Sequence, residues 1–161
     1  MATKQGDVAL LNDPVAQKLL QSAIPARLAY NWRDGTPRVV PIWFHWNGEQ
    51  IVLAGPPTAP KLKVLAQNSK VALTIDDKDW PYKLLLVRGT VQVEMVKGMV
   101  PEYVASAKRY LGEAGSEGFL EMYRKMFPEE SARMTVQPEW VGIIDMETRF
   151  PSAFEAAMAG Q

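Results

Sequence analysis

Two lysines, Lys61 and Lys63, stand at the start of a predicted short helix. Thr58 is expected to cap this helix, and Pro60 occupies its first turn. Positive charges at this end oppose the helix dipole, at about 0.3–1 kcal/mol each. A bound anion, held by free N–H groups, the threonine hydroxyl and the lysines, would reverse that penalty. The segment therefore predicts a phosphate site, while exposed lysines without a ligand explain the sequence equally well.

Residues 38–46 predict a strand that is apolar on both faces. Such a strand needs two partners, the core of a barrel on one side and a second subunit or a flat ligand on the other. Because Pro41 cannot donate a hydrogen bond to a neighbouring strand, it is expected at an edge or a bulge, where ligands often approach. A well-packed central strand that tolerates the proline is the alternative. The two faces carry Val40, Ile42, Phe44 and Trp46, and Val39, Pro41 and Trp43.

Three further side chains could contact a ligand. Trp80 and Tyr82 follow a predicted strand, and exposed aromatic rings beside a pocket can cover a planar molecule. His45, the single histidine, shares a strand face with Trp43 and is expected either to be structural or to donate a hydrogen bond to a substrate. The acidic run at residues 76–79 lacks the glycine and glutamate of a calcium loop and predicts a solvated turn. Acid–base hydrolysis has little support, because no nucleophile–base pair and no paired carboxylates stand out in the sequence.

The composition limits the class of protein. The 161 residues fit one domain, and 47% hydrophobic with 22% charged residues can build a core. Eighteen basic residues balance eighteen acidic ones, which argues against a nucleic-acid binder. The absence of cysteine and the single histidine exclude disulfides, a thiol nucleophile and cysteine- or histidine-rich metal sites. Since neither a signal peptide nor a membrane span is read in the sequence, a cytoplasmic protein is expected.

The spacing of apolar residues predicts the elements that position these side chains. Asp13-Pro14 indicates a helix start, and Asp34-Gly35 and Asn47-Gly48 indicate hairpin turns. Gly112 is expected to end one helix and Ser116 to cap the next. About seven strands result, enough to close a small barrel. The predicted strands are 26–32, 38–46, 51–54, 71–76, 87–95, 132–136 and 140–144, and the predicted helices lie near 14–20, 59–67, 100–111 and 119–126.

Several of these segments, in this order, resemble those of a known family, the pyridoxamine 5'-phosphate oxidase-like split-barrel flavoproteins. The lysine segment that follows two hairpins is moderately specific, whereas each piece alone is not. The resemblance covers roughly residues 12–150. The matching segments are 35–44, 61–65, 68–73, 88–91 and 140–142.

The resemblance implies a mostly β fold with short helices, namely a six- to seven-stranded antiparallel split β-barrel of the Greek-key, FMN-binding type. It implies one domain over residues 1–161 with a helical insertion at about 99–127. It also implies a homodimer with two cofactor sites at the subunit interface. FMN is the expected cofactor and a deazaflavin coenzyme the alternative, with a small molecule as substrate and neither nucleic acid nor membrane as partner.

The resemblance also implies roles for individual residues. Thr58, Lys61 and Lys63 correspond to ligands of the flavin phosphate. The flavin ring would lie along two strand segments. These segments consist of Val40, Pro41, Ile42 and Trp43, and of Leu53, Ala54 and Gly55.

Other side chains are expected around the ring. By the same resemblance, Trp80, Tyr82 and Trp140 line the site or cover it from the partner subunit. His45 and Tyr82, together with Trp43, would shape the substrate side. The resemblance assigns neither a catalytic residue nor a metal ligand.

The C-terminal end departs from true pyridoxamine phosphate oxidases, which are longer and end in a substrate-binding segment with arginine and histidine. Residues 147–151 include no second histidine, so oxidation of pyridoxamine phosphate is not expected. The short chain and residues 79–82 resemble the branch that contains deazaflavin-dependent reductases. The sequence therefore predicts a flavin- or deazaflavin-dependent oxidoreductase. The alternative is a non-enzymatic carrier of a flavin, haem or another planar ligand.

Overall fold

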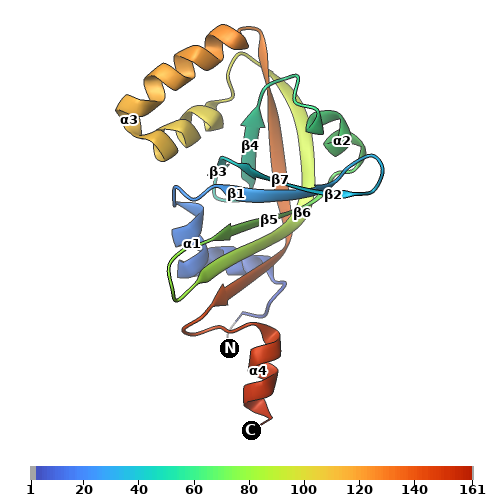
Figure 1. The fold of residues 1–161 in the computed structure, drawn as a ribbon, viewed down its shortest axis with the longest axis vertical. Coiled ribbons are helices and arrows are strands. Elements are labelled where there is room, and N and C mark those ends of the chain that lie inside the picture. The colour runs from blue at the N-terminus through green and yellow to red at the C-terminus, as the bar shows by residue number, and fades with distance from the viewer. Residues whose placement is uncertain (1–2, 161) are drawn as a thin grey trace.

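The computed structural model describes residues 3–160 and consists of one curled antiparallel sheet with helices around it (Figure 1). The strands, in the order β2-β1-β5-β6-β7-β4-β3, form a single seven-stranded sheet. They are β1 (Ala26–Asn31), β2 (Pro37–Ile42), β3 (Phe44–Trp46), β4 (Ile51–Gly55), β5 (Lys70–Asp76), β6 (Lys83–Lys97) and β7 (Glu130–Asp145). The helices are the 3-10 turn η1 (Val8–Asn12), α1 (Pro14–Leu20), α2 (Lys61–Gln67), α3 (Pro101–Met126) and α4 (Ser152–Ala159).

The two edges of the sheet are consecutive pieces of chain. β2 forms one edge by pairing with β1, and β3 forms the other by pairing with β4. Only Trp43 separates them, so the chain crosses from one edge to the other at this residue and the sheet curls into a half-barrel. The prediction of one continuous strand over 38–46 was wrong. The prediction of an antiparallel split barrel with short helices is confirmed.

The long hairpin of β6 and β7 runs the length of the barrel (Figure 1). Arg88 lies opposite Trp140 and Gly89 opposite Pro138, so Glu139 is the extra residue of a bulge. A side chain at position 89 would collide with the Gln137 carbonyl, because its Cβ would lie 2.1 Å from that oxygen. The segments 132–136 and 140–144, predicted as two strands, form one strand, and the bulge accommodates Pro138 between them. The number of strands remains seven because one predicted strand splits while two merge.

The interior of the barrel is an apolar core. Phe44, Leu53 and Met134 are fully buried there, and each such side chain stabilises the fold by about 1.5–3 kcal/mol. α1 closes one end, and it begins as predicted, with Pro14 in its first turn and the Asp13 carboxylate accepting from the Val15 N–H at 2.9 Å. Other core residues are Leu10, Leu20, Leu28, Leu65, Leu73, Ile75, Leu85, Val136 and Ile143.

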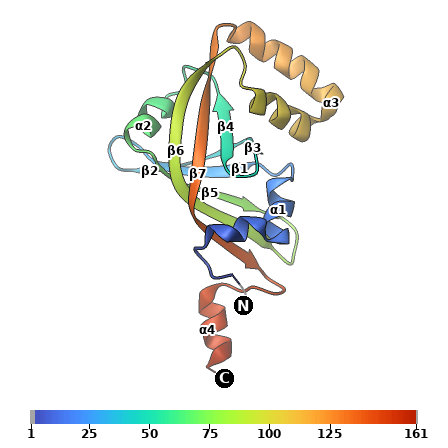
Figure 2. The ribbon, with the colours of Figure 1, turned by 180° about the vertical axis from the view of Figure 1, so that it is seen from behind.

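α3 packs against β3 and β4 on the outside of the barrel (Figure 2). It consists of two helical halves that meet at Gly112, whose φ of 76° is accessible chiefly to glycine. The first half therefore ends where the sequence predicts. Ser116 does not cap the second half as expected; it is buried and donates to the Glu113 carbonyl at 2.9 Å. Among residues 3–160, no helix is long and apolar enough to cross a membrane.

Candidate functional site

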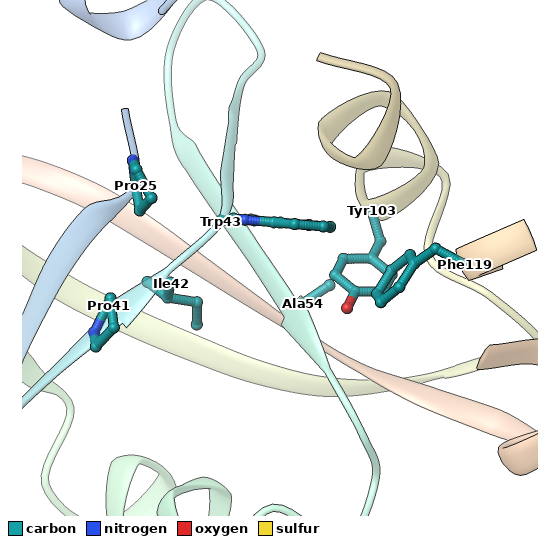
Figure 3. A pocket seen from close by; sticks show the side chains of 7 residues that line it. All are labelled: Pro25, Pro41, Ile42, Trp43, Ala54, Tyr103 and Phe119. Carbon is teal, nitrogen blue, oxygen red and sulfur yellow. The ribbon is translucent and has the colours of Figure 1, made fainter. Parts of the chain in front are cut away.

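A pocket of about 340 Å³ lies between α3 and the point where β2 passes into β3 (Figure 3). Four of its seven lining residues come from the two segments that the sequence assigns to a ring. The other three come from the entry to β1 and from the two halves of α3. The lining residues are Pro41, Ile42, Trp43 and Ala54, and Pro25, Tyr103 and Phe119.

Trp43 forms one wall of this pocket. Tyr110 stacks on the indole with a centroid distance of 5.1 Å and an angle of 6° between the planes. The hydroxyl of Tyr110 donates to the Ile24 carbonyl at 3.0 Å, which holds the stack in place. Tyr110 covers one face of the indole and does not line the pocket, whereas Trp43 does. The face of the indole opposite Tyr110 is therefore the one that a ligand in the pocket could contact. Figure 3 shows the indole edge-on, with Ile42 and Ala54 on the pocket side.

Tyr103 brings a polar atom to the pocket wall. Its ring packs against Phe119 and Tyr123, with centroids 6.1 and 4.9 Å away. In Figure 3 its hydroxyl oxygen points toward Ala54. Burial, with a smaller contribution from Tyr123, raises the pKa of Tyr103 to about 12. The phenol therefore stays protonated at neutral pH and can donate a hydrogen bond.

Charged side chains lie beside the pocket in the layer between α3 and the sheet. Arg133 of β7 pairs with Glu94 at 3.1 Å and with Glu102 of α3. Arg109 of α3 donates to the carbonyl of Phe44, whose ring lies 4.7 Å from the guanidinium carbon. These contacts fix the first half of α3, which carries Tyr103, against the strands.

His45 lies in the same layer but does not line the pocket. Its Nδ1 is buried and has no hydrogen-bond partner among the described residues. Burial and the nearby Arg109 lower the pKa of His45, while Glu102 raises it by less. The imidazole is therefore neutral at neutral pH, and its predicted contact with a substrate remains a prediction.

The predicted phosphate site differs from expectation in one respect. α2 begins at Lys61, its N-cap is Pro60, and no side chain caps it, so the prediction that Thr58 is the cap was wrong. Thr58 and Lys63 are exposed. Lys61 is half-buried, forms no ion pair with any carboxylate within residues 3–160, and burial lowers its pKa. A half-buried cation without a carboxylate fits an anionic ligand.

Lys61 follows the pocket closely along the chain. Ala54 lines the pocket, and the seven residues from there to Lys61 can span at most about 25 Å. The segment between them carries Gly55, which is buried in β4 without lining the pocket. Lys61 is therefore joined to the pocket residue Ala54 by a short stretch of chain.

The remaining predicted ring residues face the core. The side chain of Leu53 is only 1% exposed, and Val40 packs against the same core. Neither lines the pocket. Only their backbone atoms could contact a bound ring.

The three aromatic residues expected to cover the ring lie elsewhere. Trp80 and Tyr82 pack edge to face at 5.4 Å and are 68% and 45% exposed. Trp140 lies under the guanidinium of Arg88 at 4.0 Å, against Gly6. None of the three lines the pocket in this single chain, so their action from a partner subunit remains a prediction.

The sequence interpretation missed Tyr103, Phe119 and Pro25 as pocket residues. The helix predicted over 100–111 and its successor carry an aromatic face that includes Tyr103, Tyr110 and Phe119. That face was a detectable signal. Which strands it packs against depends on tertiary structure, and no local pattern encodes that.

No group of three or more His, Cys, Asp or Glu side chains within residues 3–160 could hold a metal ion. The pocket thus offers stacking surfaces and one phenol. These features suit binding and orientation of a flat molecule.

Comparison with solved structures gives the same fold. An F420 reductase matches with 26% identity and a TM-score of 0.61, over 78% of this chain and 94% of its own. A conserved hypothetical protein of Mycobacterium tuberculosis matches at 17% identity and TM-score 0.67, over 89% and 91% of the two chains. The haem storage protein of Vibrio cholerae matches at 19% and 0.56, over 83% and 93%. The last two likenesses show the fold alone.

A family model decides the classification. No curated protein matches the chain. The model of pyridoxamine 5'-phosphate oxidase matches residues 13–143, which is most of the chain and includes both the pocket strands and α2. The chain therefore belongs to the pyridoxamine 5'-phosphate oxidase family.

Proposed function

We propose that the protein is a flavin- or deazaflavin-dependent oxidoreductase that acts on a small molecule. The observation that carries this proposal is the pocket, where four residues that the resemblance places beside a flavin ring meet aromatic walls from α3. The family match and the similarity to an F420 reductase support it. FMN is the first candidate cofactor and a deazaflavin the second.

In this proposal one group of residues binds the phosphate of the cofactor and another binds its ring. Lys61, with Lys63 beside it, would hold the phosphate, because the half-buried ammonium pairs with no carboxylate in the part of the chain that the structure describes. The backbone of residues 40–43 would hold the ring. The bound cofactor would supply hydride transfer, and the protein would supply orientation and exclusion of water.

A second copy of the chain belongs to this proposal. In β2 the side chain of Val39 is 63% exposed and Pro41 is exposed as well, although the strand is apolar. A homodimer would cover this face and bring aromatic side chains of the partner, such as Trp80, toward the cofactor. Size-exclusion chromatography with light scattering measures the oligomeric state, and a strictly monomeric protein would contradict this part of the proposal.

A non-enzymatic carrier is the second candidate. Tyr103, with a pKa of about 12, is the one titratable side chain among the described residues that line the pocket. A site without a group that exchanges protons near neutral pH favours binding over turnover. Steady reoxidation of reduced cofactor by small-molecule acceptors separates the two, because a carrier binds without turnover.

Titration with FMN and with the deazaflavin, followed by cofactor fluorescence, tests the anion site. Lys61→Met should weaken binding by about tenfold to a hundredfold, as expected for loss of a charged hydrogen bond. Lys18→Met, which removes an exposed lysine of α1, is the matched control and should change nothing. Equal affinity of the wild type and Lys61→Met would refute the phosphate assignment.

A further inference from the structure

The wall of the pocket carries no charge. Its seven lining residues are apolar or aromatic, and their polar side-chain groups are the Tyr103 hydroxyl and the indole N–H of Trp43. The volume of about 340 Å³ suits a small ring system. A charged group against this wall would lose hydration, and none of the lining side chains could serve as its counterion, which is unfavourable. The lining therefore selects uncharged ligands.

The rings around the pocket favour a flat ligand. Trp43 presents one face, because Tyr110 occupies the other in a parallel stack. Phe119 lies 5.2 Å from the indole at an angle of 58° and stands across the pocket wall (Figure 3). A planar molecule can stack on Trp43 while its edge meets Phe119, the arrangement that aromatic pairs prefer.

The Tyr103 hydroxyl favours a ligand that accepts a hydrogen bond from it. Contacts with Phe119 and Tyr123 fix its ring, and the hydroxyl points into the pocket (Figure 3). It has no hydrogen-bonding partner in the described part of the chain, unlike the hydroxyl of Tyr110, which donates to Ile24. A ligand that fills the pocket without accepting this hydrogen bond would leave the phenol desolvated and unpaired.

We propose that the pocket between Trp43 and α3 is the substrate compartment, and that its substrate is an uncharged planar molecule whose oxygen or nitrogen accepts a hydrogen bond from Tyr103. This assignment rests on the proposed function, since it places the substrate next to the ring that residues 40–43 would hold. It gives the helical segment 101–126 the role of selecting the substrate.

Three related probes test the class of ligand. 2-Acetylnaphthalene is flat, uncharged and has one carbonyl acceptor; 2-ethylnaphthalene has the same shape without the acceptor; 2-naphthoate has acceptors and a negative charge. Calorimetric titration of the purified protein should show the order acetyl, ethyl, naphthoate from tightest to weakest. Binding of naphthoate as tight as that of 2-acetylnaphthalene would overturn the uncharged class.

The variant Tyr103→Phe tests the hydrogen bond. Affinity for 2-acetylnaphthalene should fall about three- to tenfold, while affinity for 2-ethylnaphthalene should stay the same or rise. Tyr30→Phe is the matched control, because Tyr30 packs in the barrel core and does not line the pocket, so both affinities should stay unchanged. Equal losses for the two probes in Tyr103→Phe, or no loss for either, would overturn the role of Tyr103.

Saturation with FMN or the deazaflavin distinguishes this inference from the proposed function. If 2-acetylnaphthalene still binds to the cofactor-loaded protein, the pocket is a compartment separate from the ring. If the cofactor displaces the probe, the pocket holds the ring itself and the substrate compartment is refuted. If neither cofactor binds while the Tyr103-dependent binding remains, the oxidoreductase proposal fails and the ligand class of the pocket stands.

Discussion

The interior of the barrel and the layer under α3 share the same strands but have opposite character. Phe44 and Leu53 point into the barrel and are fully buried in an apolar core. Their chain neighbours Trp43 and Ala54 line the pocket beneath α3 instead. Each of these two segments thus contributes one residue to the stable core and its neighbour to the candidate site.

The two regions also differ in their content of buried polar atoms. The layer under α3 contains buried nitrogen and oxygen atoms that lack a hydrogen-bond partner within residues 3–160, while the barrel core consists of hydrophobic residues. Unpaired buried groups cost stability and occur where a site needs them. The barrel therefore supplies more of the stability than the layer under α3, which holds the candidate site. The unpaired atoms include His45 Nδ1, Glu102 Oε2, Arg109 Nε and Arg133 Nε.

The largest effect is expected from Leu53→Ala. This side chain is buried in the barrel, so its truncation should lower the free energy of unfolding by about 2–5 kcal/mol. Binding of 2-acetylnaphthalene by the folded variant should not change, because Leu53 does not line the pocket. Urea unfolding and calorimetric titration measure the two quantities.

The adjacent substitution Ala54→Leu is the matched control for this prediction. The added carbons enter the pocket and not the packed core. The free energy of unfolding should therefore change by less than about 1 kcal/mol, which is below the usual cost of adding carbons to a well-packed core. Probe affinity should fall at least about tenfold. A stability loss as large as that of Leu53→Ala would show that the α3 layer is packed as tightly as the barrel.

Glu102→Gln should have an intermediate effect, because it weakens the link between α3 and β7 through Arg133. The expected loss is about 1–2 kcal/mol in the free energy of unfolding, since Arg133 keeps its contact with Glu94. Glu121→Gln, which breaks the exposed pair with Lys125, should cost less than about 0.5 kcal/mol. Equal losses in the two variants would mean that the buried link contributes no more than a surface pair.

Gly112→Ala tests the kink that lets the two halves of α3 meet at the pocket. The positive φ of 76° should cost about 1–2 kcal/mol with an L side chain, although no atom obstructs a Cβ there. Gly118→Ala, in a regular part of the helix with open space, should raise stability by about 0.4–1 kcal/mol instead. Thermal unfolding of the two variants should therefore shift in opposite directions, and shifts of the same sign would contradict the assigned kink.

The smallest effect is expected from the titration of His45. Burial and Arg109 hold its pKa below the ordinary value of 6.5, and Glu102 opposes this only in part. Just below pH 6.5 the histidine of the unfolded chain is protonated while His45 of the folded chain is still neutral. The free energy of unfolding should therefore fall as the pH drops from 6.5 toward the pKa of the folded protein. Above pH 6.5 this contribution of His45 should be fully present. The Cε1 proton resonance of the single histidine reports that pKa directly. A value above 6.5, or the same pH dependence in His45→Gln, would contradict this description.

The sequence predicts most of the elements because their signals are local. The cap of α1 at Asp13, the turns at Gly35 and Gly48 and the break at Gly112 each follow from one residue type in one backbone conformation. The division of residues 38–46 at Trp43 has no such signal. It follows from closure of the sheet, which places β2 and β3 at opposite edges.

The candidate site was only partly predictable for the same reason. Pro41, Ile42, Trp43 and Ala54 were identified by resemblance, and they meet at one pocket. Thr58 fits a cap by composition, but the helix begins one turn later at Lys61. Tyr103 and Phe119 come from helices whose docking no local pattern encodes.

Hydrogen exchange of the free protein, and of the protein saturated with 2-acetylnaphthalene, tests most directly whether the α3 layer is the ligand compartment. In the free protein the amides of α3 should exchange faster than those of β6 and β7, because the layer beneath α3 is less completely packed. The ligand should slow exchange in α3 and leave the long hairpin unchanged. Slower exchange confined to another part of the molecule, with α3 unaffected, would contradict the division between a stable barrel and a binding layer.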